Sequence, residues 1–144
     1  MALLGVGTPA PTFKGMNLTG PEINLENYKG KKSVVLIFAP DRVDPGQTNQ
    51  VKTLYNKYKD KTEVITASRK VPSISMAKAF LQQLGVKFPT LYDPTMAVYK
   101  LYGVENPAVL YIIDPEGNIA YAAQMDANKV DPKALEEAIA ANVK

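Results

Sequence analysis

The stretch SVVLIFAPDRVDPGQT, residues 33–48, decides the fold class of this chain. Its first seven residues are almost all apolar and rich in β-branched side chains, which predicts a central strand covered on both faces. A loop with two prolines and a glycine follows, and apolar residues then recur at the spacing of a helix, at Val51, Leu54, Tyr55 and Tyr58. The stretch therefore predicts a helix N-terminus, with its free N–H groups, at the end of a buried strand.

The same alternation of strands and helices extends over the rest of the chain. Further strands are expected at residues 63–68, 88–93, 108–114 and 118–123. Further helices are expected at residues 73–85, 94–102 and 131–143, with Ser73 and Asp131 as N-caps. The turn Pro-Glu-Gly makes the last two strands an antiparallel hairpin, and residues 9–31 predict a small hairpin on the sheet edge. The pattern predicts one α/β domain, residues 1–144, in which a mixed sheet is flanked by helices and carries this N-terminal hairpin extension.

The composition is that of an ordinary globular protein. Hydrophobic residues make up 46% and charged residues 22% of the 144 residues, and the net charge is +3 with both signs interspersed. This pattern predicts no nucleic-acid partner, because the basic residues do not cluster with aromatic ones. No apolar run approaches the roughly 20 residues of a membrane span, and the opening MALLGVGTPAP lacks the basic segment of a signal peptide. We therefore expect no membrane contact and a cytoplasmic location.

Two residue types are missing altogether, because the chain has no cysteine and no histidine. Without cysteine there is no disulfide, thiolate nucleophile or thiolate-ligated metal. Without histidine the chain lacks the commonest general base and the commonest transition-metal ligand. Asp41 and Asp44 offer two carboxylates, which are too few for a metal site. We expect no bound metal and no cofactor.

Three blocks of the chain, taken together, resemble one family. The first, GVGTPAPTFKGMNLTGPEINLENYKGKKSVVLIFAP, has a Gly-x-x-Ala-Pro-x-Phe entry and a Leu-x-x-Tyr-Lys-Gly-Lys segment ahead of the first core strand. The other two, FLQQLGVKFPTLYDPTMAVYKLYGV and AVLYIIDPEGNIAY, contain a helix that ends at glycine, a Phe-Pro strand, an Asp-Pro helix start and a closing hairpin. In this order the blocks are similar to the peroxiredoxin-like alkyl hydroperoxide reductase/thiol-specific antioxidant (redoxin) family, of the bacterioferritin-comigratory type. The resemblance implies a thioredoxin-like fold over nearly the whole chain.

In that family the reactive elbow has the form Pro-x-x-x-Thr-Pro-Gly-Cys-Thr, whose cysteine thiolate attacks the peroxide while the threonine and a distant arginine hold its oxygens. The matching residues of this chain are Pro40, Pro45, Gly46 and Thr48. Gln47 takes the place of the cysteine, Asp44 that of the threonine, and Ala108 or a neighbour that of the arginine. The resemblance thus implies a member that is inactive as a thiol peroxidase, because no sulfur is present that could pass to sulfenic acid.

The elbow is also the candidate pocket of this chain. Its residues are Pro40, Arg42, Asp44, Gly46, Gln47 and Pro107. One interpretation is structural, with Asp44 capping the helix that Pro45 begins; the other is a binding site in which Arg42 and Gln47 hold a small polar ligand. Pro107 is either a cis-proline that faces this pocket or a trans proline at the start of a strand.

Two further groups of side chains have alternative interpretations. The lysines 52, 57, 59 and 61 are expected to form a solvated helix face. Seven of the eight tyrosines fall within the predicted elements, and their alternative use is an aromatic platform for a ligand. Four of them fit helix core faces, namely Tyr55, Tyr58, Tyr99 and Tyr102, and three belong to strands, namely Tyr92, Tyr111 and Tyr121.

Two functions from different classes follow from these observations. The first is a non-catalytic module that binds a protein partner or a small polar ligand, and the resemblance implies self-association into a homodimer. The second is a redox-associated oxidoreductase that works through a partner's thiols or a bound cofactor. A fold does not by itself carry a function, so the site has to decide between them.

Overall fold

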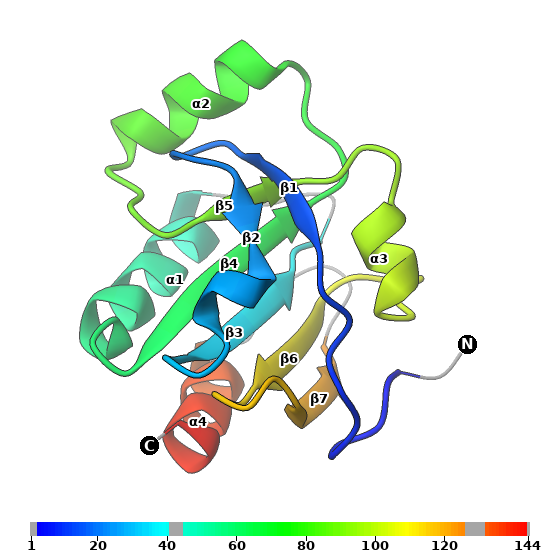
Figure 1. Ribbon diagram of the computed structural model, residues 1–144. Helices are drawn as coiled ribbons and strands as arrows, with labels where there is room; N and C mark the ends of the chain where they lie inside the picture. The colour runs from blue at the N-terminus through cyan, green and yellow to red at the C-terminus, as the bar shows by residue number, and fades with distance from the viewer. Residues whose placement is uncertain (1–2, 41–44, 126–131, 144) are drawn as a thin grey trace.

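The computed structural model describes residues 3–40, 45–125 and 132–143, which form a mixed seven-stranded sheet with helices on both faces (Figure 1). The strands are β1 (Lys14–Asn17), β2 (Ile23–Asn24), β3 (Ser33–Phe38), β4 (Thr62–Ser68), β5 (Thr90–Tyr92), β6 (Val109–Ile113) and β7 (Ile119–Gln124). The α-helices are α1 (Pro45–Tyr58), α2 (Ile74–Gln83), α3 (Ala97–Leu101) and α4 (Pro132–Asn142), and a short 3-10 helix, η1, covers Leu25–Tyr28. The predicted order of elements is confirmed.

The sheet has the strand order β2-β1-β5-β4-β3-β6-β7. Strands β3, β4 and β5 are parallel, so their carboxyl ends meet at one edge of the sheet. Strand β6 runs antiparallel to both β3 and β7, which confirms the closing hairpin. The N-terminal hairpin of β1 and β2 is also confirmed, and β1 attaches it to the sheet by pairing with β5.

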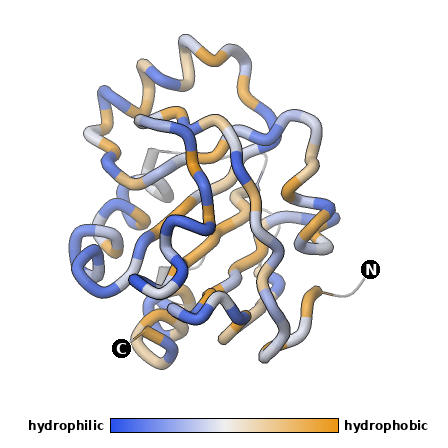
Figure 2. Tube along the Cα trace, in the orientation of Figure 1, coloured by the Kyte–Doolittle hydropathy of each residue, from blue (hydrophilic) through white to orange (hydrophobic). Residues whose placement is uncertain are grey.

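Strand β3 is apolar at almost every position because both of its faces are buried. Val34, Leu36 and Phe38 point to the face that α3 and the N-terminal segment cover. Val35 and Ile37 point to the opposite face, which is covered by α1, α4 and part of α2. Figure 2 shows the result as orange along the central strands and mostly blue along the turns of α1.

An aromatic cluster fills the core between β3, β6 and α3. Phe38 lies at its centre, with ring centroids 4.9 Å from Tyr99, 5.6 Å from Tyr102 and 6.2 Å from Tyr111. These three tyrosines are fully buried, and each hydroxyl donates to a backbone carbonyl; the acceptors are those of Ala67, Pro11 and Tyr102. The core interpretation of Tyr99, Tyr102 and Tyr111 is therefore confirmed.

The buried phenols predict that the protein loses stability at high pH. Burial raises the pKa of Tyr102 and of Tyr111, and burial followed by the negative charge of Glu63 raises the pKa of Tyr28 to about 12. In the unfolded chain a phenol ionises near pH 10. Unfolding therefore releases protons above about pH 10, and the phenols' contribution is complete below that pH and is lost progressively as the pH rises above it.

Urea unfolding followed by circular dichroism, from neutral pH to about pH 11, measures this loss. We expect the free energy of unfolding to decrease progressively above about pH 10. The variant Tyr102→Phe keeps the ring and removes one ionising group, so its decrease should be smaller than that of the native chain. A free energy that stays constant up to about pH 11 would contradict the prediction.

Helix α3 is shorter than the sequence predicts, because it begins at Ala97 and not at residue 94. The buried carboxylate of Asp93 accepts hydrogen bonds from the backbone N–H groups of Ala97, Val98 and Tyr99, at 3.1, 2.9 and 3.1 Å. Met96, immediately before the helix, has a left-handed backbone with φ of 61°. The chain thus makes a turn after Asp93 before the helix can start.

The capping and lysine predictions are confirmed in part. The Ser73 hydroxyl accepts from the Met76 N–H at the start of α2, as predicted, whereas Asp44 and Asp131 lie outside the described residues. Lys52 is not part of a solvated face, because its ammonium donates to the Leu84 carbonyl at 2.9 Å. No helix within the described residues is long and apolar enough to cross a membrane.

Candidate functional site

The elbow joins the end of β3 to the start of α1. The Ala39 N–H donates to the Ala67 carbonyl at 2.9 Å, which continues the β3–β4 pairing one residue beyond the strand. Pro40 follows and is buried, and α1 begins at Pro45. Because β3 is central in the sheet, this elbow places the first turn of α1 over the carboxyl ends of the parallel strands, where ligands of open α/β sheets bind.

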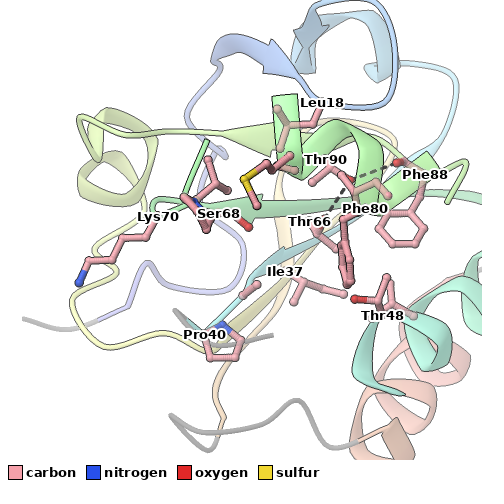
Figure 3. Close-up of a pocket in the computed structure, with 17 residues that line it drawn as sticks. Leu18, Ile37, Pro40, Thr48, Thr66, Ser68, Lys70, Phe80, Phe88 and Thr90 are labelled. Carbon is pink, nitrogen blue, oxygen red and sulfur yellow. Dashed lines mark hydrogen bonds between the residues drawn. The ribbon is translucent and has the colours of Figure 1, made fainter. Parts of the chain in front are cut away.

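A cavity of about 350 Å³ lies at this elbow, between α1, α2, the carboxyl ends of β3 and β4 and the start of β5 (Figure 3). Its size falls at the lower end of the range of about 300–1,000 Å³ that is usual for small-molecule sites. Thr48 and Val51 line it from α1, and Ile37 lines it from β3. Pro40 lines the side of the cavity next to the elbow, and Leu18 lines it from the end of the N-terminal hairpin.

Helix α2 provides the opposite wall. Met76, Ala77, Phe80 and Leu81 line the cavity from this helix, and Phe88 lines it from the segment ahead of β5. Met76 is 65% exposed and Phe80 38% exposed, so the side chains of α2 form the mouth of the cavity as well as its wall. Figure 3 shows the rings of Phe80 and Phe88 directed into the cavity.

Two threonines bring hydroxyl groups to this apolar cavity from the strands. Thr66 on β4 is 9% exposed and Thr90 on β5 is 5% exposed. The Thr66 hydroxyl donates to the Thr90 hydroxyl at 3.5 Å, and the Thr90 hydroxyl donates to the Phe88 carbonyl at 3.4 Å (Figure 3). Hydroxyl hydrogen bonds are usually 2.7–2.8 Å long. Both bonds are therefore long and weak for buried groups.

The structure brings only part of the predicted site together. Pro40 lines the cavity, whereas Gly46 is exposed in the first turn of α1 and is not among the described lining residues. Gln47 has a described backbone in that turn, but its side chain lies outside the described residues, as do Arg42 and Asp44. Of the predicted polar cluster, the structure therefore describes Pro40, Gly46 and the backbone of Gln47, but none of its polar side chains.

Pro107 and Ala108 lie beside the elbow and are not among the described lining residues. Ala108 is fully buried and precedes Val109, which pairs with Phe38 at the end of β3. The cis peptide bond at this place joins Pro107 to Ala108, and the bond from Asn106 to Pro107 is trans. The trans interpretation of Pro107 is therefore the correct one.

Arg69 is a charged residue that the sequence analysis passed over. It is one of only two arginines in the chain and follows β4 directly. Its guanidinium lies over the Tyr99 ring, 5.7 Å from the centroid, and donates to the Met96 sulfur at 3.5 Å. It lines a second cavity on the α3 face, not the cavity at the elbow. Among the described residues, no three Asp, Glu, His or Cys side chains are grouped closely enough to hold a metal ion.

The contribution of α2 to the cavity is not among the predictions from the sequence. Its signal is a wide apolar stripe of Met76, Ala77, Phe80, Leu81 and Leu84, of which only Leu81 is buried in the core. A helix that presents more apolar surface than the core covers has a side available for a ligand. Sequence alone does not distinguish such a side from a core face.

Comparison with known proteins places these observations in context. The family model described as AhpC/TSA family matches residues 6–122. Thiol-disulfide oxidoreductase ResA of Bacillus thuringiensis subsp. konkukian is 32% identical over 117 residues, which cover 79% of this chain and 66% of the relative, so the chain spans about two thirds of that protein. Alkyl hydroperoxide reductase E of Mycobacterium bovis is 27% identical over 151 residues, covering 96% of this chain and 98% of the relative.

A solved structure extends the similarity to the fold. The putative thiol:disulfide interchange protein DsbE of Chlorobium tepidum superposes with a TM-score of 0.77 and 26% identity, covering 96% of this chain and 98% of the other. The sheet and its helices thus have the arrangement that the three sequence blocks imply, and the predicted fold is confirmed.

Proposed function

The chain belongs to the AhpC/TSA family, and from this premise we propose that it is a non-catalytic member that binds a small molecule in the cavity at the elbow. Both named relatives are described by thiol or peroxide chemistry, as an oxidoreductase and a reductase. This chain has no cysteine at any position. A thiol peroxidase needs a sulfur that passes to sulfenic acid, and disulfide exchange needs an attacking thiolate. Neither reaction is open to the chain's own side chains.

The observation that supports binding is the cavity itself. A site that had only lost its cysteine could have collapsed, because side chains at a vacated site tend to pack together. Here about 350 Å³ stays open between α1 and α2, beside the elbow whose sequence matches the reactive elbow of the family. The walls come from β3, β4, β5 and two helices, so the cavity is a property of the fold and not of one loop.

The described walls favour a ligand different from the small polar one that the sequence suggests. That expectation depends on Arg42, Asp44 and Gln47, whose side chains lie outside the described residues. The described lining is dominated by carbon, and its apolar side chains include Phe80, Phe88 and Ile37. These side chains favour a ligand that buries apolar surface against them.

Peroxide and disulfide assays test the non-catalytic half of the proposal. We expect the protein to consume hydrogen peroxide no faster than a protein-free control, with dithiothreitol or thioredoxin as reductant, and to leave the rate of insulin disulfide reduction unchanged. The matched variant is Gln47→Cys, which puts one thiol at the position that the family uses. Without reductant, that variant should consume about one equivalent of peroxide as its thiol passes to sulfenic acid and the peroxide to water. With dithiothreitol present, the sulfenic acid is reduced back to the thiol, so slow turnover is expected.

Turnover by the native protein above the control would overturn the proposal. It would favour the alternative of a redox protein that acts through a partner's thiols or a bound cofactor. Repeating the assay after denaturing purification with refolding tests this alternative, because a copurified partner or cofactor is then removed and the turnover should disappear.

A further inference from the structure

We propose that the ligand of the elbow cavity is an uncharged, mainly apolar molecule with one hydrogen-bonding group, which meets the hydroxyls of Thr66 and Thr90. This inference rests on the proposed function and specifies the ligand for the same site. It combines three observations: the apolar wall, the weakly bonded hydroxyl pair, and the direction of the one charged side chain among the described lining residues.

The apolar wall selects against a charged ligand. Phe80, Phe88 and Ile37 would surround the ligand body with carbon on several sides (Figure 3). Transferring an ionised group from water to such surroundings is costly unless an opposite charge or several hydrogen bonds compensate for it. Apolar surface, by contrast, gains about 25 cal/mol for each Å² removed from water. A largely apolar body is therefore the kind that this wall stabilises.

The hydroxyl pair adds one polar contact to this apolar site. Thr66 is buried, and within the described part of the chain its hydroxyl makes one hydrogen bond, to the Thr90 hydroxyl at 3.5 Å. At that length the bond recovers little of what burial of a hydroxyl costs. A ligand hydroxyl or carbonyl could approach Thr66 at the usual distance of about 2.8 Å. The pair thus favours a ligand with one polar group at the end that reaches the strands.

Lys70 does not change this preference for an uncharged ligand. Among the described residues that line the cavity it is the only one with a charged side chain. It is exposed, and Figure 3 shows its side chain extending away from the threonines and from the rings of Phe80 and Phe88. Its carbon stem belongs to the rim, and its ammonium lies far from the polar end of the proposed ligand.

A matched series of naphthalenes tests the inference by calorimetric titration of the native protein. The probes share one ring system and differ in a single group: 2-naphthol carries a hydroxyl, 2-methylnaphthalene a methyl group of similar size, and 2-naphthoate a carboxylate. We expect 2-naphthol to bind roughly three- to tenfold more tightly than 2-methylnaphthalene, the usual effect of one net hydrogen bond. We expect 2-naphthoate to bind at least about tenfold more weakly than 2-naphthol, because its carboxylate must give up its hydration to enter the apolar cavity.

Two variants locate the hydrogen bond. Thr66→Val keeps the shape of the side chain and removes the hydroxyl, so the preference for 2-naphthol over 2-methylnaphthalene should disappear while 2-methylnaphthalene binds as before. Thr53→Val is the control, because Thr53 is exposed on α1 and is not among the lining residues. If Thr66→Val does not fold, the comparison of the three probes on the native protein still decides the ligand class.

The outcomes separate the two proposals. If none of the three probes binds the native protein, the binding function itself is overturned. If 2-naphthoate binds most tightly, the proposed binding function is retained, but the inference that the ligand is uncharged is wrong. If 2-naphthol keeps its advantage in Thr66→Val, the assigned hydroxyl is wrong.

Discussion

Replacing Ala77 with phenylalanine is expected to abolish binding of 2-naphthol while the protein stays folded. Ala77 lines the cavity from the middle of α2, so a benzyl group there occupies the volume that the ligand needs. We expect the dissociation constant for 2-naphthol to rise on the order of a hundredfold, which corresponds to about 2.7 kcal/mol of lost binding free energy. Stability should change by less than about 1 kcal/mol, because the added ring enters an existing cavity and does not overpack the core.

The matched control is Ala79→Phe, on the same helix two residues away. Ala79 is exposed and is not among the described lining residues, so the same substitution should leave the dissociation constant unchanged. Calorimetric titration gives the affinity of each variant, and thermal unfolding verifies that each is folded. Native-like binding by Ala77→Phe would mean that the ligand binds elsewhere, and the elbow cavity would lose its proposed role.

The largest expected effect on stability comes from Asp93→Ala. The carboxylate accepts three backbone hydrogen bonds at the start of α3 and is 6% exposed, so its loss leaves three N–H groups without an acceptor, of which those of Val98 and Tyr99 are buried. Each buried unpaired donor costs about 1–3 kcal/mol, and loss of an N-cap costs about 1 kcal/mol. Some of the N–H groups can reach water once the side chain is removed, so we expect a total near 3 kcal/mol. For a chain of this length the melting temperature should fall by roughly 10 °C.

Two further variants make this prediction specific to the cap. Asp93→Asn keeps one acceptor oxygen and should give an intermediate loss. Asp60→Ala removes a carboxylate from an exposed position after α1 and should change the free energy of unfolding by less than about 0.5 kcal/mol. Chemical denaturation of the three variants gives the comparison. A loss below about 1 kcal/mol for Asp93→Ala would show that the three N–H groups find other acceptors.

Most of the sheet could be predicted from local sequence because its strands have simple surroundings. Strand β3 is buried on both faces and therefore shows an unbroken apolar run. The β6–β7 hairpin has a turn sequence that fits only a reversal of the chain. Helix α3 shows the limit of this approach, since its start depends on where the carboxylate of Asp93 lies and not on helix propensity.

The cavity could be predicted only in its location. The elbow after β3 follows from strand and helix signals, and Pro40 at this elbow lies on the cavity wall. Thr66, Phe80 and Thr90 come from three elements and meet only because β5 pairs with β4 and α2 packs above them. The proximity of these residues depends on the strand order, which local sequence patterns do not determine.

The central position of β3 has a consequence for synthesis on the ribosome. One edge of β3 pairs with β4, which follows after a single helix, but the other edge pairs with β6, whose Val109 meets Phe38 some seventy residues later. Until β6 emerges, an uncharged and strongly apolar strand has an unpaired edge, which is the kind of segment that recruits other chains. We expect a nascent chain that is stalled before residue 109 to associate with chaperones or to aggregate, and one extended past β7 to be protected.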